Sequence, residues 1–481
     1  MDTVHSHAAI KTGQKSAHIF PLPHDFNGTG LLKPVIRKDL FMKSLYSGNL
    51  RRDYARFCFP CIANLIVFSI YSIVDCLFVS HYVSADALAA VTLSHPYLSV
   101  LFSIGITLAV GAGTLIAEAL GEKDQKKADF IFSENLIVTI ILGVIICIPV
   151  LIFLKPISLF FGADSSTLKY TSDYIGSIAP FSVFFIMEYN LEFLVKTDGN
   201  PTLSLFTVIG TSLLNIFLDW LFVAVWGMET FGAGLATGIS QAVATVIFLS
   251  YILFSKNGLF HFHRFKWDLS LYKKLIPLGF ADGSMEILSA IMVLIYNNLL
   301  EHNIGTQGVA AFGVIIYIFN LVFNMSTGVT QGMEPLVSYH LGAEKPGNCR
   351  RLYRYALTLQ LILGTAVFFV CEIFTLKIVG IFFQPHETEA IALAVYGLRR
   401  YACCFILLGF NLLTSGYMTS LCRPAPALTI SMCRAFFVHV TVLLAMFLLF
   451  GINSIWWSVV ISESIVAVIS IILLKNNQPQ L

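Results

Sequence analysis

Among the acidic residues inside long apolar stretches of this sequence, five stand out. They are Asp75, Glu188, Asp219, Glu286 and Glu463. A carboxylate surrounded by lipid costs at least about 2.5 kcal/mol, so each of these side chains needs a partner or a function. The chemistry open to such groups is the binding of a metal cation or of a proton.

Asp75 and Asp219 form the sharpest pattern. Tyr71 precedes Asp75 by four residues and Asn215 precedes Asp219 by four, so each pair shares one face of its helix. In the span layout given below, Asp75, Asp219 and Thr237 all lie at one depth in the outer half of the membrane. Hard cations prefer such carboxylate, amide and hydroxyl oxygens, and two carboxylates in a dry site can instead share a proton. The pattern predicts a cation site and leaves H⁺ and Na⁺ open.

The other three acids are candidates for a solute cavity. Glu286 lies nine residues after Pro277, about 13 Å along a helix at about 1.5 Å per residue and so near mid-membrane. There it would attract a cationic solute, or else pair with a polar group of a neighbouring helix; Glu188 and Glu463 are weaker candidates. The position in the second half that corresponds to Asp75 is Met292. We therefore expect a specialised ion site in the first half alone.

The elements that carry these residues follow from composition. Of 481 residues, 57% are apolar and 12% are charged, whereas soluble domains carry about 25% charged residues. The solvent for most of the chain is therefore lipid. A net charge of +2 gives no sign of nucleic-acid binding, and no catalytic motif is present. We expect a transport protein with no cofactor, and neither an enzyme nor a scaffold.

Runs of about 20 apolar residues mark membrane-spanning helices. Twelve such spans are predicted, near 54–80, 87–119, 129–154, 171–195, 201–226, 231–255, 272–300, 307–340, 351–378, 391–419, 425–450 and 452–474. They divide the chain into an N-terminal tail (1–53), a first lobe (54–255), a linker (256–271), a second lobe (272–475) and a C-terminal tail (476–481). The predicted fold is an all-α membrane protein of two pseudo-symmetric six-helix lobes.

Basic residues fix the expected orientation, because cytoplasmic flanks are rich in Lys and Arg. If the N-terminus is inside, 24 of the 30 basic residues fall on the inner side. Both termini and the linker are therefore predicted to be cytoplasmic, in the plasma (inner) membrane.

The two halves repeat at a spacing of 221–222 residues. Leu120-Gly121 corresponds to Leu341-Gly342, and Gln241 corresponds to Glu463. Six spans return the chain to its starting side, so the repeats are parallel. Transporters use such repeats as two bundles that rock around a central site. Pro60, within the first span, is the predicted hinge.

Three phrases of the sequence resemble those of the multidrug and toxic compound extrusion (MATE) family of secondary transporters. They are Pro60 with Tyr71-Ser72-Ile73-Val74-Asp75, Ala89-Ala90-Val91 and Pro96; Asp198-Gly199-Asn200-Pro201 with Asn215 and Leu218-Asp219; and Gln331-Gly332-Met333-Glu334-Pro335-Leu336-Val337-Ser338-Tyr339 with Gly342-Ala343. Two departures are Lys196, where many members have arginine, and Glu334, where glutamine is usual.

The resemblance implies two lobes around a central cavity and antiport of an organic solute against H⁺ or Na⁺. It also implies a cation site in the N-lobe at Asp75, Asn215, Asp219 and Thr237. We expect export of small cationic or amphipathic organic compounds by a monomer. The alternative within transport is a flippase of lipid-linked oligosaccharide precursors, which should line its cavity with several basic residues.

Overall fold

The computed structural model describes residues 49–255, 258–263, 266–383 and 387–477. The expected N-terminal tail lies almost wholly outside these ranges. Eleven of the described helices are long and apolar enough to cross a membrane. They become twelve if the pair Thr388–Ala402 and Phe405–Ser420, which meet at 48°, is one bent span. The predicted all-α fold is confirmed.

Several helices of the first lobe begin directly after a polar capping residue. Ser84, Asp124 and Asn200 each accept a hydrogen bond from the first turn of the helix that follows. The elements of this lobe are α2 (Leu50–Tyr82), α3 (Ala85–Gly121), α4 (Gln125–Ile152), α5 (Leu154–Phe160), α6 (Leu168–Ile178), η1 (Ala179–Phe181), α7 (Ser182–Thr197), α8 (Pro201–Asp219), η2 (Trp220–Val225) and α9 (Glu229–Phe254).

The second lobe repeats this order, with its interruptions at different places. The eleventh predicted span of the chain changes partway from α-helical to π-helical winding and then returns to an α-helix. The elements are α10 (Leu269–Asn303), α11 (Thr306–Gly342), α12 (Pro346–Val379), α13 (Thr388–Ala402), α14 (Phe405–Ser420), α15 (Pro424–Met432), η3 (Cys433–Phe437), α16 (Val438–Phe450), η4 (Ile452–Trp457) and α17 (Ser458–Asn476).

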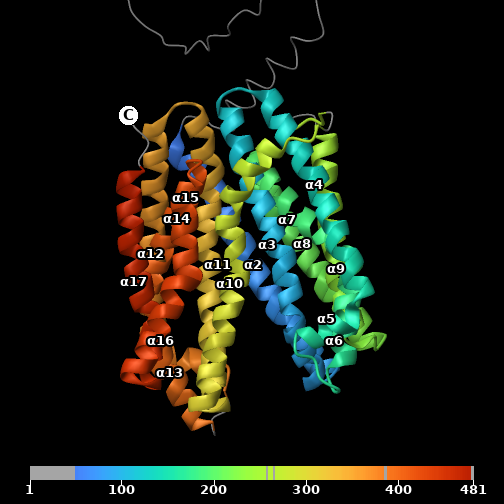
Figure 1. Ribbon diagram of the computed structural model, residues 1–481, viewed down its shortest axis with the longest axis vertical. Helices are drawn as coiled ribbons and strands as arrows, with labels where there is room; N and C mark the ends of the chain where they lie inside the picture. The colour runs from blue at the N-terminus through green and yellow to red at the C-terminus, as the bar shows by residue number, and fades with distance from the viewer. Residues whose placement is uncertain (1–48, 256–257, 264–265, 384–386, 478–481) are drawn as a thin grey trace, which may run out of the picture.

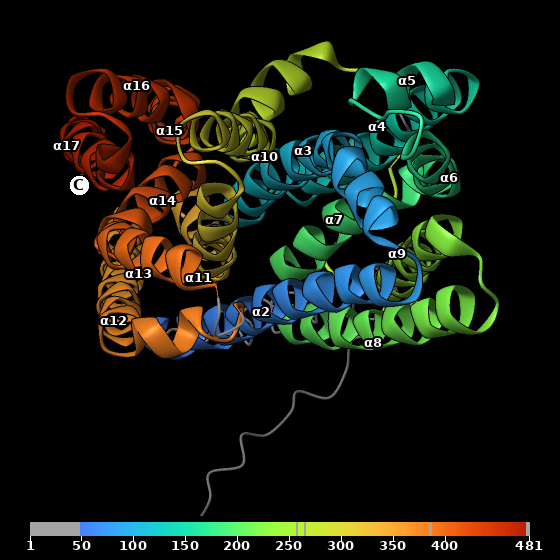
Figure 2. The same cartoon turned by 90° about the horizontal axis from the view of Figure 1, so that it is seen from below.

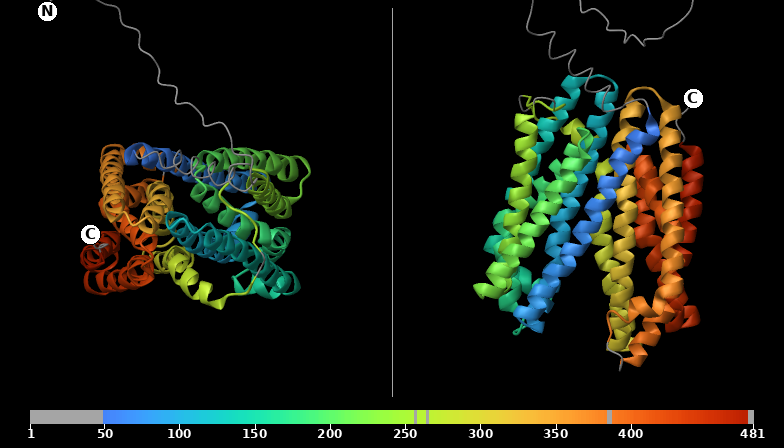
Figure 3. Two further views of the ribbon diagram at one scale, coloured as in Figure 1. Left: turned by 90° about the horizontal axis from the view of Figure 1, so that it is seen from above. Right: turned by 180° about the vertical axis from the view of Figure 1, so that it is seen from behind.

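The two lobes stand side by side, with blue to green helices in one and yellow to red helices in the other (Figure 1). The interface is made mainly by α3, which packs on α10 and α11, and by α2, which packs on α11 and less extensively on α12. Views from below and from above show α2 lying between α8 of its own lobe and the helices of the other (Figures 2 and 3). The first described helix, α2, therefore contacts both lobes.

Repeat-related glycines bring the lobes together at one end. A Cβ atom on Gly121 would lie 2.1 Å from the carbonyl oxygen of Tyr339, and one on Gly342 would lie 1.9 Å from that of Glu118. Only glycine allows backbones to approach so closely. Gly332 meets the backbone of Cys58 in the same way. The lobes are therefore closed at the end where α3 and α11 finish, which our orientation places in the cytoplasm.

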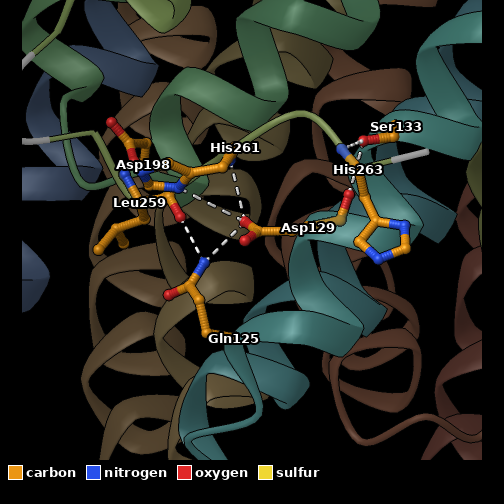
Figure 4. A network of polar contacts seen from close by, with 7 residues as sticks. All are labelled: Gln125, Asp129, Ser133, Asp198, Leu259, His261 and His263. Atoms are coloured by element: carbon orange, nitrogen blue, oxygen red, sulfur yellow. Dashed lines mark hydrogen bonds and ion pairs between the residues drawn. The ribbon is translucent and has the colours of Figure 1, made fainter. Parts of the chain in front are cut away.

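The segment that joins the lobes is docked on the first lobe. The backbone N–H of Leu259 donates to Asp198 at 2.7 Å, that of His261 to Asp129 at 2.9 Å and that of His263 to Ser133 Oγ at 2.8 Å. Alternate residues of the extended segment thus meet side chains that stand along α4 and at the end of α7 (Figure 4). Residues 256–257 and 264–265 of the predicted linker lie outside the described residues.

Candidate functional site

The carboxyl groups of Asp75 and Asp219 lie within hydrogen-bonding reach of each other. Asp75 comes from α2, and Asp219 is the last residue of α8 before the π-helical turn η2. Such π-helical turns are rare and recur at functional sites. Asp219 is fully buried and Asp75 is partly buried. The sequence placed both residues at one depth, and the structure brings them into contact.

Several polar atoms around this pair lack a conventional partner. Asp75 Oδ1, both oxygens of Asp219, and both the oxygen and the nitrogen of the Asn215 amide make no other hydrogen bond with the described residues. Buried polar groups are nearly always hydrogen-bonded, so unsatisfied ones call for an explanation. Carboxylate and amide oxygens gathered in this way fit a small cation or a shared proton.

Tyr71, Asn215 and Thr237 line one cavity beside the acid pair, and so does Glu188. The Thr237 hydroxyl donates to the carbonyl oxygen of Ala233 at 3.0 Å, and its lone pairs remain open. The cavity measures about 40 Å³. That space suits an ion with a few waters, whereas drug-sized ligands occupy roughly 300–1,000 Å³.

A second polar group at the inner end of α7 was not anticipated. Lys196 is 1% exposed and forms an ion pair with Glu192 at 2.6 Å. Its ammonium also donates to Gln331 of α11, in the other lobe, at 3.0 Å. Glu192 in turn accepts hydrogen bonds from Asn64 and Ser204. The Glu-Lys spacing of four residues was the signal in the sequence that could have revealed this pair.

The structure places Glu463 elsewhere, within the second lobe. Its carboxylate pairs with Arg434 Nε at 3.1 Å and accepts from the Asn411 amide at 2.7 Å. Arg434 belongs to the π-helical turn η3 and also contacts the sulfur of Met285 at 3.4 Å. Glu463 is thus 3% exposed and fully engaged, and it does not line the N-lobe cavity.

Glu286 lies on α10 and reaches toward the first lobe. It is partly buried and interacts electrostatically with Tyr189 of α7, a residue that lines the N-lobe cavity. A carboxylate between the lobes is well placed to meet a cationic solute, and this role stays a prediction.

Two further acids that the sequence analysis did not single out lie in the second lobe, and the ion site expected in the first half alone stays a prediction. Asp282 of α10 and Glu334 of α11 interact electrostatically within the second lobe. The residue of the second half that corresponds to Asp75 is Met292, as expected. Asp282 and Glu334 therefore occupy positions that the repeat does not relate to Asp75 and Asp219. Spacing along the chain could not reveal their interaction, since the two acids are 52 residues apart on different helices.

Pro60 lies inside α2, which runs as one helix from Leu50 to Tyr82. Its neighbours Cys58 and Ile62 pack against Gly332 and Gly328 of α11. The proline therefore sits in the part of α2 that touches the other lobe. A hinge at Pro60 stays a prediction.

The fold and the buried acids define a multi-pass membrane transporter built from two six-helix repeats. The family model described as MatE matches residues 60–221 and 277–445, which is more than half of the chain. The chain therefore belongs to the MATE family of ion-coupled efflux transporters, which are not enzymes. The family resemblance read from the sequence is confirmed.

Individual relatives agree with this assignment. The chain is 26% identical over 422 residues to the multidrug export protein MepA of Staphylococcus aureus (strain MSSA476), covering 87% of this chain and 92% of that one. It superimposes with a TM-score of 0.85 and 19% identity on a multidrug resistance MATE family transporter in its outward-facing conformation, covering 90% of this chain and 97% of that one. A transporter of the MOP superfamily from Pyrococcus furiosus gives a TM-score of 0.84 at 21% identity, covering 90% and 96% of the two chains. These solved structures share the fold.

Proposed function

We propose that this transporter exports small organic cations in exchange for a proton or Na⁺ taken up by Asp75 and Asp219. One observation carries the proposal: two carboxyl groups from different helices meet in a buried site whose oxygens have few other partners. Two adjacent carboxylates resist joint ionisation, so the site gains by taking up a cation. Tyr71, Asn215 and Thr237 complete its polar wall.

Conformational coupling follows from where the two acids sit. Asp75 belongs to α2, the helix that contacts α8 in its own lobe and α11 in the other. Neutralising the pair changes how α2 is held against α8, and Pro60 gives α2 a point at which it can bend. Ion binding in the first lobe can thereby alter the contact between the lobes.

The direction of transport rests on orientation. Basic residues favour a cytoplasmic location for both termini, and the lobes are closed at that end. We infer an outward-facing state in the plasma membrane, ready to take an ion from outside. The described contacts between the two lobes are made within one chain, and we propose that the transporter is a monomer.

The cargo is inferred from charge. Glu286 and Glu188 offer carboxylates at the lobe interface and in the N-lobe, which favours a cationic solute. A curated relative is named a multidrug export protein. The rival flippase reading needs free basic side chains, but each fully buried basic residue among those described, Lys196 and Arg434, is paired with a carboxylate.

Transport in proteoliposomes under a pH gradient or a Na⁺ gradient, imposed one at a time, tests the proposal. Wild-type protein should accumulate ethidium against its gradient under one of them. The double variant Asp75→Asn/Asp219→Asn should insert and fold but accumulate nothing, and Asp86→Asn, an exposed acid of α3, is the matched control. Full transport by the double variant would exclude the acid pair as the coupling site.

A further inference from the structure

Arginines of both lobes gather where the inner ends of α2 and α12 meet. Arg51 and Arg52 lie in the first turn of α2, and Arg351 lies in the second turn of α12. All three side chains are exposed. The guanidinium of Arg51 lies over the ring of Tyr355 of α12, 5.4 Å from the ring centre. Because α2 belongs to the first lobe and α12 to the second, this contact joins the two lobes (Figure 3).

Helix geometry places further positive charge around the ring of Tyr355. Arg351 precedes Tyr355 by four residues and therefore lies one turn away on the same face of α12. Arg354, which is also exposed, precedes Tyr355 directly. None of these four arginines forms an ion pair with the described residues. The seam between α2 and α12 thus accumulates positive charge that no described ion pair neutralises.

The general bias of Lys and Arg toward the inner side does not account for this arrangement. That bias places basic residues at the inner ends of helices throughout the protein, as it does with the exposed Lys273 and Lys274 of α10. At the seam, two helices from different lobes bring their arginines to one tyrosine. The planar guanidinium presents a fork of N–H donors that matches the oxygens of a phosphate group. The seam therefore fits an anionic phosphate group.

An apolar hollow lies farther along the same face of α12. It is lined by Leu361, Ile362, Thr365, Ala366 and Phe369. The hollow begins ten residues after Arg351, about 15 Å along the helix. Ile362 follows Tyr355 by seven residues, so the hollow and the tyrosine share one face, and this face is exposed at Ile362 and Phe369. A ligand that reaches from the arginines to the hollow needs an anionic head and a long apolar chain, as an acidic phospholipid has.

We propose that the seam between α2 and α12 binds one anionic phospholipid, whose headgroup phosphate joins Arg51 and Arg52 of the first lobe to Arg351 of the second. Basic pockets between membrane helices on the inner side bind acidic headgroups by the same chemistry. The phosphate relieves the repulsion among the arginines and connects the lobes. When the inner ends of the lobes separate, one headgroup can no longer reach both helices. The bound lipid therefore stabilises the state that is closed at the inner end.

The experiment is native mass spectrometry of the purified full-length protein in detergent, titrated with phosphatidylglycerol or with phosphatidylcholine of the same chains. The wild-type protein should retain one phosphatidylglycerol in preference to phosphatidylcholine. Arg51→Gln/Arg351→Gln should weaken this binding about 25-fold, or about fivefold for each arginine, which corresponds to about 1 kcal/mol. Lys273→Gln/Lys274→Gln removes the same charge elsewhere at the inner side and should leave the binding unchanged. Circular dichroism and thermal unfolding without lipid establish that both variants are folded.

Two outcomes of the titration would overturn the proposed lipid site. An equal loss of affinity in the two double variants would show general attraction to positive charge. Displacement of the lipid by excess glycerol 3-phosphate would show a site for the phosphate group alone.

Hydrogen exchange tests whether the lipid holds the inner end closed. Phosphatidylglycerol should slow amide exchange at the inner ends of α3 and α11, where Gly121 and Gly342 meet the opposite lobe, in the wild-type protein. It should not do so in Arg51→Gln/Arg351→Gln, and equal slowing in both proteins would refute the connecting role. Neither measurement uses an ion gradient or a cargo, so both are independent of the proposed export function.

Discussion

Replacing Asp219 by asparagine should separate solute binding from pumping. Asp219 is fully buried and its carboxyl group meets that of Asp75. The two groups cannot both ionise cheaply, so the unloaded pair keeps one proton and the loaded pair holds two. In Asp219→Asn the amide donates permanently to Asp75, as the protonated acid does. The variant is then held in a form that resembles the unloaded pair, because the fixed amide hydrogen bond keeps Asp75 ionised and opposes uptake of the second proton.

The size of the expected ethidium gradient follows from the exchange of one proton for each ethidium ion. A gradient of one pH unit stores about 1.36 kcal/mol per proton, which supports about a tenfold solute gradient. Exchange of one proton for one monovalent cation moves no net charge, so the membrane potential adds nothing. We expect proteoliposomes with an interior one pH unit more acidic to accumulate ethidium about tenfold with wild-type protein, and not at all with Asp219→Asn.

Two further measurements accompany the assay of ethidium uptake. Ethidium binding to purified Asp219→Asn should stay near the wild-type affinity, because the acid pair does not hold the cargo. Asp86→Asn should pump normally, since Asp86 is exposed in the first turn of α3. If folded Asp219→Asn still builds a severalfold ethidium gradient, the argument from a shared proton is refuted. If a Na⁺ gradient alone drives ethidium uptake by the wild-type protein, the same site binds Na⁺. A pH gradient should then drive no ethidium uptake.

Three further variants probe the lobes and their charges. Glu286→Gln should slow export of cationic dyes more than of neutral solutes in transport assays; an equal loss for both would argue against charge recognition. Gly342→Ala should hinder closure at the inner end and lower thermal stability by about 1–3 kcal/mol, whereas Gly347→Ala, with open space around its Cβ position, should not; similar unfolding curves for the two would contradict the close approach. Glu463→Gln should cost about 3–5 kcal/mol by leaving Arg434 unpaired, and Arg434→Met should restore much of that loss; additive losses in the double variant would disprove the pairing.

Much of the N-lobe site could be predicted from helix geometry. Four-residue spacing fixed which residues share a face with Asp75 and Asp219, and counting from helix ends fixed their depth. The structure adds the contact between the two acids and the cavity lined by Tyr71, Asn215 and Thr237. Each step of this prediction used distances along a single helix, and the role of these residues as a cation site stays a prediction.

Pairings between helices could not be predicted in this way. Glu463 was a candidate for the solute cavity, yet the structure engages it with Arg434 and Asn411. Asp282 and Glu334 were not paired at all, because nothing in a spacing of 52 residues says that two faces meet. Their electrostatic interaction depends on how α10 and α11 are turned about their own axes.

The sequence alone determined that the chain belongs in a membrane, that candidate spans follow one another along most of its length, and that its halves repeat. Lipid imposes these features on every segment separately, because each span must be long and apolar and must satisfy its own backbone. The tertiary structure alone decided which distant charges compensate one another, such as Arg434 of η3 with Glu463 of α17. Lipid and protein interior are almost equally apolar, so hydrophobic pattern says little about which face of a helix turns inward. That choice is made by the close packing of neighbouring helices, here through glycines such as Gly121 and Gly342.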